Sequence, residues 1–138
     1  MRRFEYNLPM RIKLTSLMVD DQDKALRFYT EVLGFQKKHE IPMGPYKWLT
    51  MVSPEGPDNI ELSLEPNANP AAKAFQEAMS AQKIPLAMFE VSDIADEYAR
   101  LRAHGVGFIR EPVKMGPVTI AVFSDTCGNL IQLYQPPA

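Results

Sequence analysis

Hydrophobic and polar residues alternate in two stretches of the chain, "KLTSLMV" at 13–19 and "PLAMFEV" at 85–91. Alternation of this kind is typical of a strand with one buried face. An aspartate, Asp21 or Asp93, follows each stretch and suits a helix N-cap, because its carboxylate accepts free N–H groups of the first turn. Apolar residues then recur every three or four positions, which predicts an amphipathic helix after each strand.

The same pattern of strand and helix signals occurs twice along the chain. Met-Gly-Pro at Met43–Pro45 recurs 72 positions later at Met115–Pro117, and a β-type run follows each copy. Further matching pairs are Val19 with Val91, Asp21 with Asp93, Gly34 with Gly105 after a one-residue slip, and Glu61 with Gln132 at an offset of 71. Because the match runs element by element, we interpret the chain as an internal duplication of one β-α-β-β-β unit.

A linker helix is predicted between the two units. Asn69 suits its N-cap and Pro70 its first turn. Its expected apolar face consists of Ala71, Ala74, Phe75, Ala78 and Met79. We expect an N-terminal arm (1–10) and a single domain (11–138) made of unit one (11–66), the linker helix (67–84) and unit two (85–135). The predicted fold class is α+β, with both units contributing to one curved, cup-like mixed sheet.

Composition and charge exclude several classes of protein. The 138 residues include 15 basic and 17 acidic ones, a balance that offers no strong field to nucleic acid or anionic lipid. No apolar run reaches the length of about 18 residues that a membrane span needs. The N-terminus does not resemble a signal peptide, and the single Cys127 cannot form an internal disulfide. We expect a cytoplasmic protein without a nucleic-acid or membrane partner.

The stretches "VDDQDKALRFYTEVLGF" (19–35) and "FSDTCGNLIQLY" (123–134) resemble the glyoxalase/bleomycin-resistance/extradiol-dioxygenase superfamily, also called vicinal oxygen chelate proteins. The resemblance covers residues 11–135 and implies that the sheets of two units curl into a cup. In many members a divalent metal ion is bound in the cup and coordinates two neighbouring oxygen atoms of the substrate. Other members hold no metal and bind a compound, such as an antibiotic, in the cup.

The resemblance places the four metal-ligand positions at Leu14, Glu61, Leu86 and Gln132. Leucine has no donor atom, and one carboxylate with one amide does not complete the three protein ligands of a catalytic site. We therefore expect no metal and no other cofactor.

For three other chemically active side chains, the sequence position predicts a structural role. His39 lies in a polar run at the start of a strand and is expected on the surface. His104 precedes a helix-ending glycine, where a positive charge suits the helix dipole. Nothing near Cys127 marks it as a nucleophile.

Strand alternation predicts which residues face the cup. For the middle strands two registers are possible, one exposing Trp48, Thr50, Ile120 and Val122 and the other Leu49, Met51, Ala121 and Phe123; the alignment of the units favours the first. The predicted ligand pocket consists of Leu14, Ser16, Met18, Trp48, Thr50, Glu61, Leu86, Met88, Ile120, Val122, Gln132 and Tyr134. Apolar walls with a few polar points are typical of a small-molecule pocket. The alternative is a filled second core with Glu61 reaching water.

The sequence leaves several functions open. We predict a homodimer, with its open sheet edges protected by pairing, that binds a small apolar or amphipathic molecule. One alternative is a lyase, isomerase or extradiol-dioxygenase-like enzyme with a metal on unusual ligands. Another is a metal-free enzyme in which Glu61 is the catalytic base, its proton affinity raised by an apolar cup. The last is a dimerising scaffold without a ligand.

Overall fold

The computed structural model of this chain describes residues 10–137. The predicted arm at 1–10 therefore lies outside the described residues, apart from Met10. Unit one consists of β1 (Leu14–Val19), α1 (Gln22–Arg27), the π-helical turn η2 (Phe28–Val32), β2 (Gln36–Met43), β3 (Tyr46–Val52) and β4 (Glu61–Pro66). The linker helix α2 (Pro70–Ala81) leads to β5 (Ala87–Glu90), α3 (Ile94–Ala103), β6 (Phe108–Met115), β7 (Val118–Ser124) and β8 (Leu130–Gln135).

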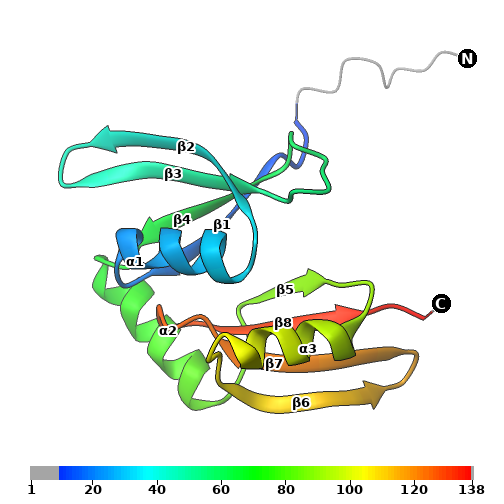
Figure 1. Ribbon diagram of the computed structural model, residues 1–138. Coiled ribbons are helices and arrows are strands. Elements are labelled where there is room, and N and C mark those ends of the chain that lie inside the picture. Colours follow the sequence, from blue (N-terminus) through cyan, green and yellow to red (C-terminus); the bar gives the residue numbers. More distant parts are fainter. Residues whose placement is uncertain (1–9, 138) are drawn as a thin grey trace, which may run out of the picture.

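The two units share one topology. Unit one forms a four-stranded sheet in the order β1-β4-β3-β2, and unit two repeats it as β5-β8-β7-β6. The α+β class and the tandem units are confirmed. The strands form two separate sheets, however, where one continuous sheet was expected, because no strand of one unit is hydrogen-bonded to a strand of the other. Figure 1 shows the two sheets as separate layers, with α1 on the side of its sheet that faces unit two.

Both predicted N-caps are present. The Asp21 carboxylate accepts hydrogen bonds from the N–H groups of Asp23 and Lys24, and Asp93 caps α3 in the same way. Gly34 and Gly105 follow the helices with φ of +89° and +83°, the left-handed conformation that favours glycine. None of the helices within residues 10–137 is long and apolar enough to cross a membrane.

A single core joins the two units. It is built from the helix-facing side of both sheets, including Leu17, Val19, Leu49, Met51, Leu64, Ala121, Phe123, Ile131 and Leu133. Phe28 of η2 crosses to unit two, where its ring lies 6.4 Å from that of Phe123. Because the helix-facing sides meet at this core, the opposite side of each sheet points outward. We call these two surfaces the outer faces.

The prediction that an apolar face of the linker helix α2 is buried is wrong, because a polar residue anchors this helix to the rest of the protein. Phe75 is 58% exposed, whereas Gln76 is only 3% exposed. The Gln76 Nε2 donates to the Met18 carbonyl and to Asn129 Oδ1. A Cβ at Gly128 would lie 2.6 Å from Gln76 Nε2, so only glycine fits beside this anchor. Ile60, which immediately precedes β4, is also exposed.

Candidate functional site

The outer faces carry the residues that were predicted to line the cup. Core packing of Leu49, Met51, Ala121 and Phe123 leaves Trp48, Thr50, Ile120 and Val122 on the outer faces, in the register that the sequence favoured. Six of the twelve predicted residues belong to each unit, but Leu86 precedes β5 and packs against the shared core. Since the outer faces point away from each other, they do not form a single cup within residues 10–137 of one chain.

Glu61 lies on the outer face of unit one, at the end where β4 and β1 begin. It begins β4, and its Cα pairs with that of Leu14 on β1. The residue is 7% exposed, and its Oε1 has no well-formed hydrogen bond among residues 10–137. Burying a carboxylate with free lone pairs is unfavourable. Glu61 therefore has spare capacity to accept a hydrogen bond from a bound molecule.

Two basic side chains from β2, Lys38 and His39, approach this carboxylate. Lys38 Nζ lies 3.7 Å from Glu61 Oε2, and His39 Nε2 lies 3.7 Å from Oε1. A β-bulge between Lys37 and His39 shifts the pairing of β2, so that both neighbours reach the same group. His39 was expected on the surface, and its side chain is indeed 39% exposed while its ring approaches Glu61.

These surroundings lower the pKa of Glu61 from its ordinary value. The hydroxyl of Thr50, which faces the carboxylate, and the charges of Lys38, His39 and Lys13 favour the ionised form, while burial acts in the opposite direction. The hypothesis that an apolar cup raises the proton affinity of Glu61 is therefore wrong. A carboxylate with a lowered pKa is a weaker general base.

A second acidic group lies farther along the same face. Ser16 Oγ donates a hydrogen bond of 2.6 Å to Glu65 Oε2, and Ser63 Oγ lies 3.4 Å from the same oxygen. Glu65 was not among the predicted site residues. Its signal in the sequence was its position four residues after Glu61 in an alternating strand, which puts both side chains on one face.

The outer face of unit two is mostly apolar. Met88 is 63% exposed, and Gln132 Nε2 donates to its Sδ at 3.3 Å. At the far end of the strands Tyr134 donates to Glu90 at 3.3 Å. Ile120 and Val122 lie in β7 and are almost fully buried. This face therefore offers apolar contact with a few neutral hydrogen-bonding groups.

The strand pairing corrects the predicted match between the two last strands. Thr50 pairs with Ser63, while Val122, which is 72 positions after Thr50, pairs with Gln132. Ser63 is thus the counterpart of Gln132, and the offset of 71 that matched Glu61 with Gln132 is wrong by two residues. The face was still predicted correctly, because a shift of two preserves the side of a strand.

Comparison with known proteins settles the family. Residues 11–133 match the family model of the Glyoxalase/Bleomycin resistance protein/Dioxygenase superfamily. The chain belongs to this superfamily. YurT of Bacillus subtilis is 57% identical over 126 residues, which cover 91% of this chain and 99% of YurT. The lactoylglutathione lyase of Salmonella typhimurium is 30% identical over 128 residues, 91% of this chain and 93% of the lyase.

Solved structures agree with the fold. UcmS2 is similar with a TM-score of 0.79 and 32% identity, covering 92% of this chain and 98% of UcmS2. TnmS3, an antibiotic binding protein from Streptomyces sp. CB03234, has a TM-score of 0.73 and 28% identity, covering 92% of this chain and 96% of TnmS3. The resemblance drawn from the two sequence stretches is therefore confirmed.

The side chains at the superfamily's metal positions do not fit a catalytic divalent ion. Leu14 and Leu86 have no donor atoms, and Glu61 already lies near two basic groups. Among the described residues, no group of three or more His, Cys, Asp and Glu side chains is arranged to hold a metal.

The remaining candidates have the structural places expected of them. His104 is the exposed C-cap residue of α3. Cys127 is fully buried, and desolvation, followed by the nearby Asp125, raises the pKa of its thiol to about 12. A thiol that stays protonated at neutral pH is a poor nucleophile.

Proposed function

We propose that this protein binds a small apolar or amphipathic molecule against the outer faces of its sheets. The observation that carries the proposal is the combination of exposed apolar side chains with one buried carboxylate that has a free acceptor atom. Ile41, which pairs with Trp48 across β2 and β3, is 50% exposed, and Met88 on the other sheet is 63% exposed. Apolar surface around a few oriented polar groups is how small-molecule sites achieve both affinity and orientation.

A structural relative supports this proposal. TnmS3 is an antibiotic binding protein with the same fold, and its similarity extends over nearly the whole chain. A binding role also requires no metal, which agrees with the leucines at two of the superfamily's ligand positions.

We further propose that a second copy of the chain completes the site. Strands β1 and β5 lie at open sheet edges, where backbone groups lack a strand partner. Pairing β1 of one copy with β5 of another would place an outer face of unit one beside an outer face of unit two. Light scattering at micromolar concentration should give about twice the chain mass of 15.6 kDa. A monomer at that concentration would contradict this part of the proposal.

Ligand binding is tested by a calorimetric screen of aromatic and amphipathic compounds, with the emission of Trp48 as an independent signal. Trp48 is the only tryptophan and lies on the outer face of unit one, so a bound compound should shift its emission. The E61Q variant should bind a confirmed compound more weakly, whereas E77Q, an exposed change on α2, should not. Compounds that bind without affecting Trp48 and without dependence on Glu61 would place the site elsewhere.

A glyoxalase-like lyase is the second candidate, favoured by the 30% identity to the Salmonella lyase. It predicts lactoylglutathione lyase activity when Zn²⁺, Ni²⁺ or Mn²⁺ is supplied, and about one metal ion per chain retained after dialysis. The donor atoms at the four positions argue against it. Elemental analysis together with this assay separates the two candidates.

A further inference from the structure

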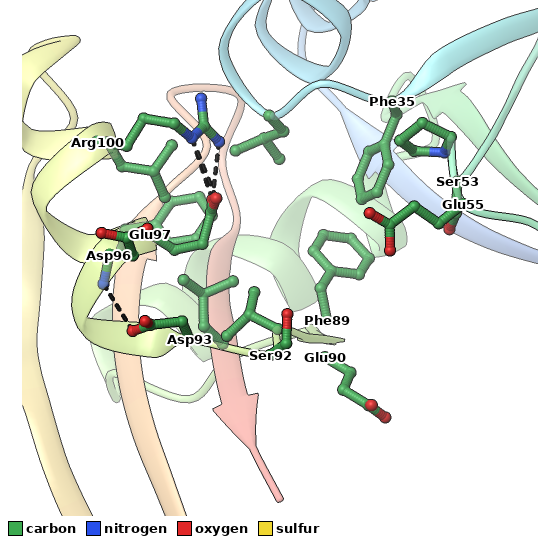
Figure 2. Close-up of a pocket in the computed structure, with 16 residues that line it drawn as sticks. Phe35, Ser53, Glu55, Phe89, Glu90, Ser92, Asp93, Asp96, Glu97 and Arg100 are labelled. Atoms are coloured by element: carbon green, nitrogen blue, oxygen red, sulfur yellow. Dashed lines mark hydrogen bonds and ion pairs between the residues drawn. The ribbon is translucent and has the colours of Figure 1, made fainter.

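A separate groove, with a volume of about 340 Å³, lies where the two units meet, on the helix side of the sheets (Figure 2). Unit one supplies the segment after η2 and the loop after β3, and unit two supplies β5 and the first turns of α3. None of the twelve predicted pocket residues lines this groove. Its volume lies at the lower end of the range of small-molecule sites, about 300–1,000 Å³.

Aromatic rings form one wall of the groove. Figure 2 shows Phe35 and Phe89 close together, and their rings meet edge to face with centroids 5.0 Å apart. Phe35 is also stacked on the buried Tyr29, at 6.4 Å and 18°, so the core holds its orientation. The other apolar lining residues are Leu33, Val91, Leu101, Phe123 and Leu133.

Carboxylates dominate the charged lining. Four of them, Glu55, Asp93, Asp96 and Glu97, share the groove with a single cation, Arg100, while the Glu90 side chain turns away to Tyr134 on the outer face. Arg100 is already engaged, because its Nη1 donates to the Val32 carbonyl at 2.9 Å and its Nη2 to Glu97 at 2.8 Å. Of the other three, Asp93 accepts the N–H of Asp96 as the N-cap of α3, and Glu55 and Asp96 form no ion pair within residues 10–137. The groove therefore carries a negative potential that no side chain lining it offsets.

We propose that this groove binds an organic cation, an amine or quaternary ammonium with an aromatic or aliphatic body. The apolar body would cover the two phenylalanine rings, whose faces also attract a positive charge. The cationic head would lie among the carboxylates of the loop after β3 and of the start of α3 with its N-cap Asp93, which favour it electrostatically. An anion would be repelled by Glu55, Asp93 and Asp96, and a neutral molecule would gain the apolar wall alone. The proposal does not depend on the function proposed for the outer faces.

The test uses the full chain and three probes of similar shape: benzyltrimethylammonium, 3-phenylpropanol and 3-phenylpropionate. Amide chemical shifts are followed in ¹⁵N-labelled protein during each titration. The ammonium probe should shift the amides of 33–35, 53–55 and 89–101, while those of 14–18 and 61–65 and the Trp48 indole stay unchanged. Binding should weaken with added salt, since exposed charges are screened. Equal responses to all three probes, or no saturable response to the ammonium, would overturn the proposal.

Paired variants test the carboxylates directly. In the double variant E55Q/D96N, affinity for benzyltrimethylammonium should fall about fivefold, because two exposed charge interactions are lost. The charge-matched control E77Q/E111Q changes acids outside the groove and should bind like the parent. Melting temperatures show that both variants are folded. Equal affinity in the two double variants would contradict a role for the groove's acids.

The aromatic wall needs its own variant. F89L keeps an apolar side chain but removes one ring face, so the ammonium probe should lose more affinity than 3-phenylpropanol does. An equal loss for both probes would show that no cation–π contact is made. Because Trp48 reports on the outer face only, the two proposals fail independently. A groove that does not bind the ammonium probe leaves the function proposed for the outer faces intact. An outer face that binds no compound leaves the proposal for the groove intact.

Discussion

Two buried carboxylates, Asp125 and Glu61, show how differently the same chemical group is used in the two units. Asp125 is fully buried in the turn before β8. It accepts hydrogen bonds from the Tyr29 hydroxyl, the N–H groups of Cys127 and Asn129, and Asn129 Nδ2, at 2.6 to 3.0 Å. Glu61 is almost as buried, yet one of its oxygens has no well-formed hydrogen bond.

This difference separates structural from functional groups. Tyr29 belongs to unit one and Asp125 to unit two, so their bond ties the units together inside the shared core. Burial, and then the negative charge of Asp125, raise the pKa of Tyr29 well above its ordinary value, which keeps the hydroxyl protonated as a donor. A carboxylate whose acceptor sites are satisfied holds the fold, whereas one with a free acceptor is available to a ligand.

The largest expected effect is on stability when Asp125 is removed. D125A leaves Tyr29 and two backbone N–H groups without their acceptor in the core. We expect a loss of about 3–5 kcal/mol in the free energy of unfolding, measured by urea denaturation. D58A, an exposed change in the loop after β3, serves as control and should stay within about 0.5 kcal/mol of the parent. A D125A loss as small as that of D58A would remove the contrast between the two carboxylates.

Removal of the partner hydroxyl should have a smaller effect. Y29F keeps the ring packing and deletes one hydrogen bond to a charged group, for an expected loss of about 1.5–3 kcal/mol. Y46F, at an exposed tyrosine on β3, should be neutral. If Y29F is also neutral, the Tyr29–Asp125 bond does not join the units energetically.

At neutral pH, E61Q should change stability far less than D125A does. The charges of Lys38 and His39 are 3.7 Å away and partly exposed, so we expect a loss of at most about 1 kcal/mol. The same denaturant measurement checks this value, with E31Q on η2 as an exposed control. A loss comparable to that of D125A would make Glu61 a structural group.

The smallest expected effect is the pH dependence of the difference in free energy of unfolding between the parent and E61Q. The folded pKa of Glu61 is lower than the ordinary value of 4.5, so ionisation favours the folded state. Its contribution is present above the unfolded pKa and is lost as the pH falls through the folded pKa. The gap between parent and E61Q should therefore close on acidification below about pH 4.5. A gap that widens in acid would mean that the pKa is raised.

Much of the local architecture was determined by the sequence. The caps at Asp21 and Asp93, the glycine helix ends and the outward side of Trp48 and Thr50 follow from alternation and capping within a few residues. The lack of donors at Leu14 and Leu86 is a property of residue identity. The shared topology of the two units was likewise visible, since each unit repeats the same order of local signals.

Only the tertiary structure decided how these pieces face one another. The division into two sheets, the anchoring of α2 by Gln76 and the groove between Phe35 and Phe89 all arise from contacts between residues far apart in the chain. The pKa of Glu61 was misjudged for the same reason, because strand pairing brings to its carboxylate first the Thr50 hydroxyl of β3 and then Lys38 and His39 of the bulged β2. Alternation fixes the side on which a residue lies, but the charges it meets there depend on which strands pair and in what register.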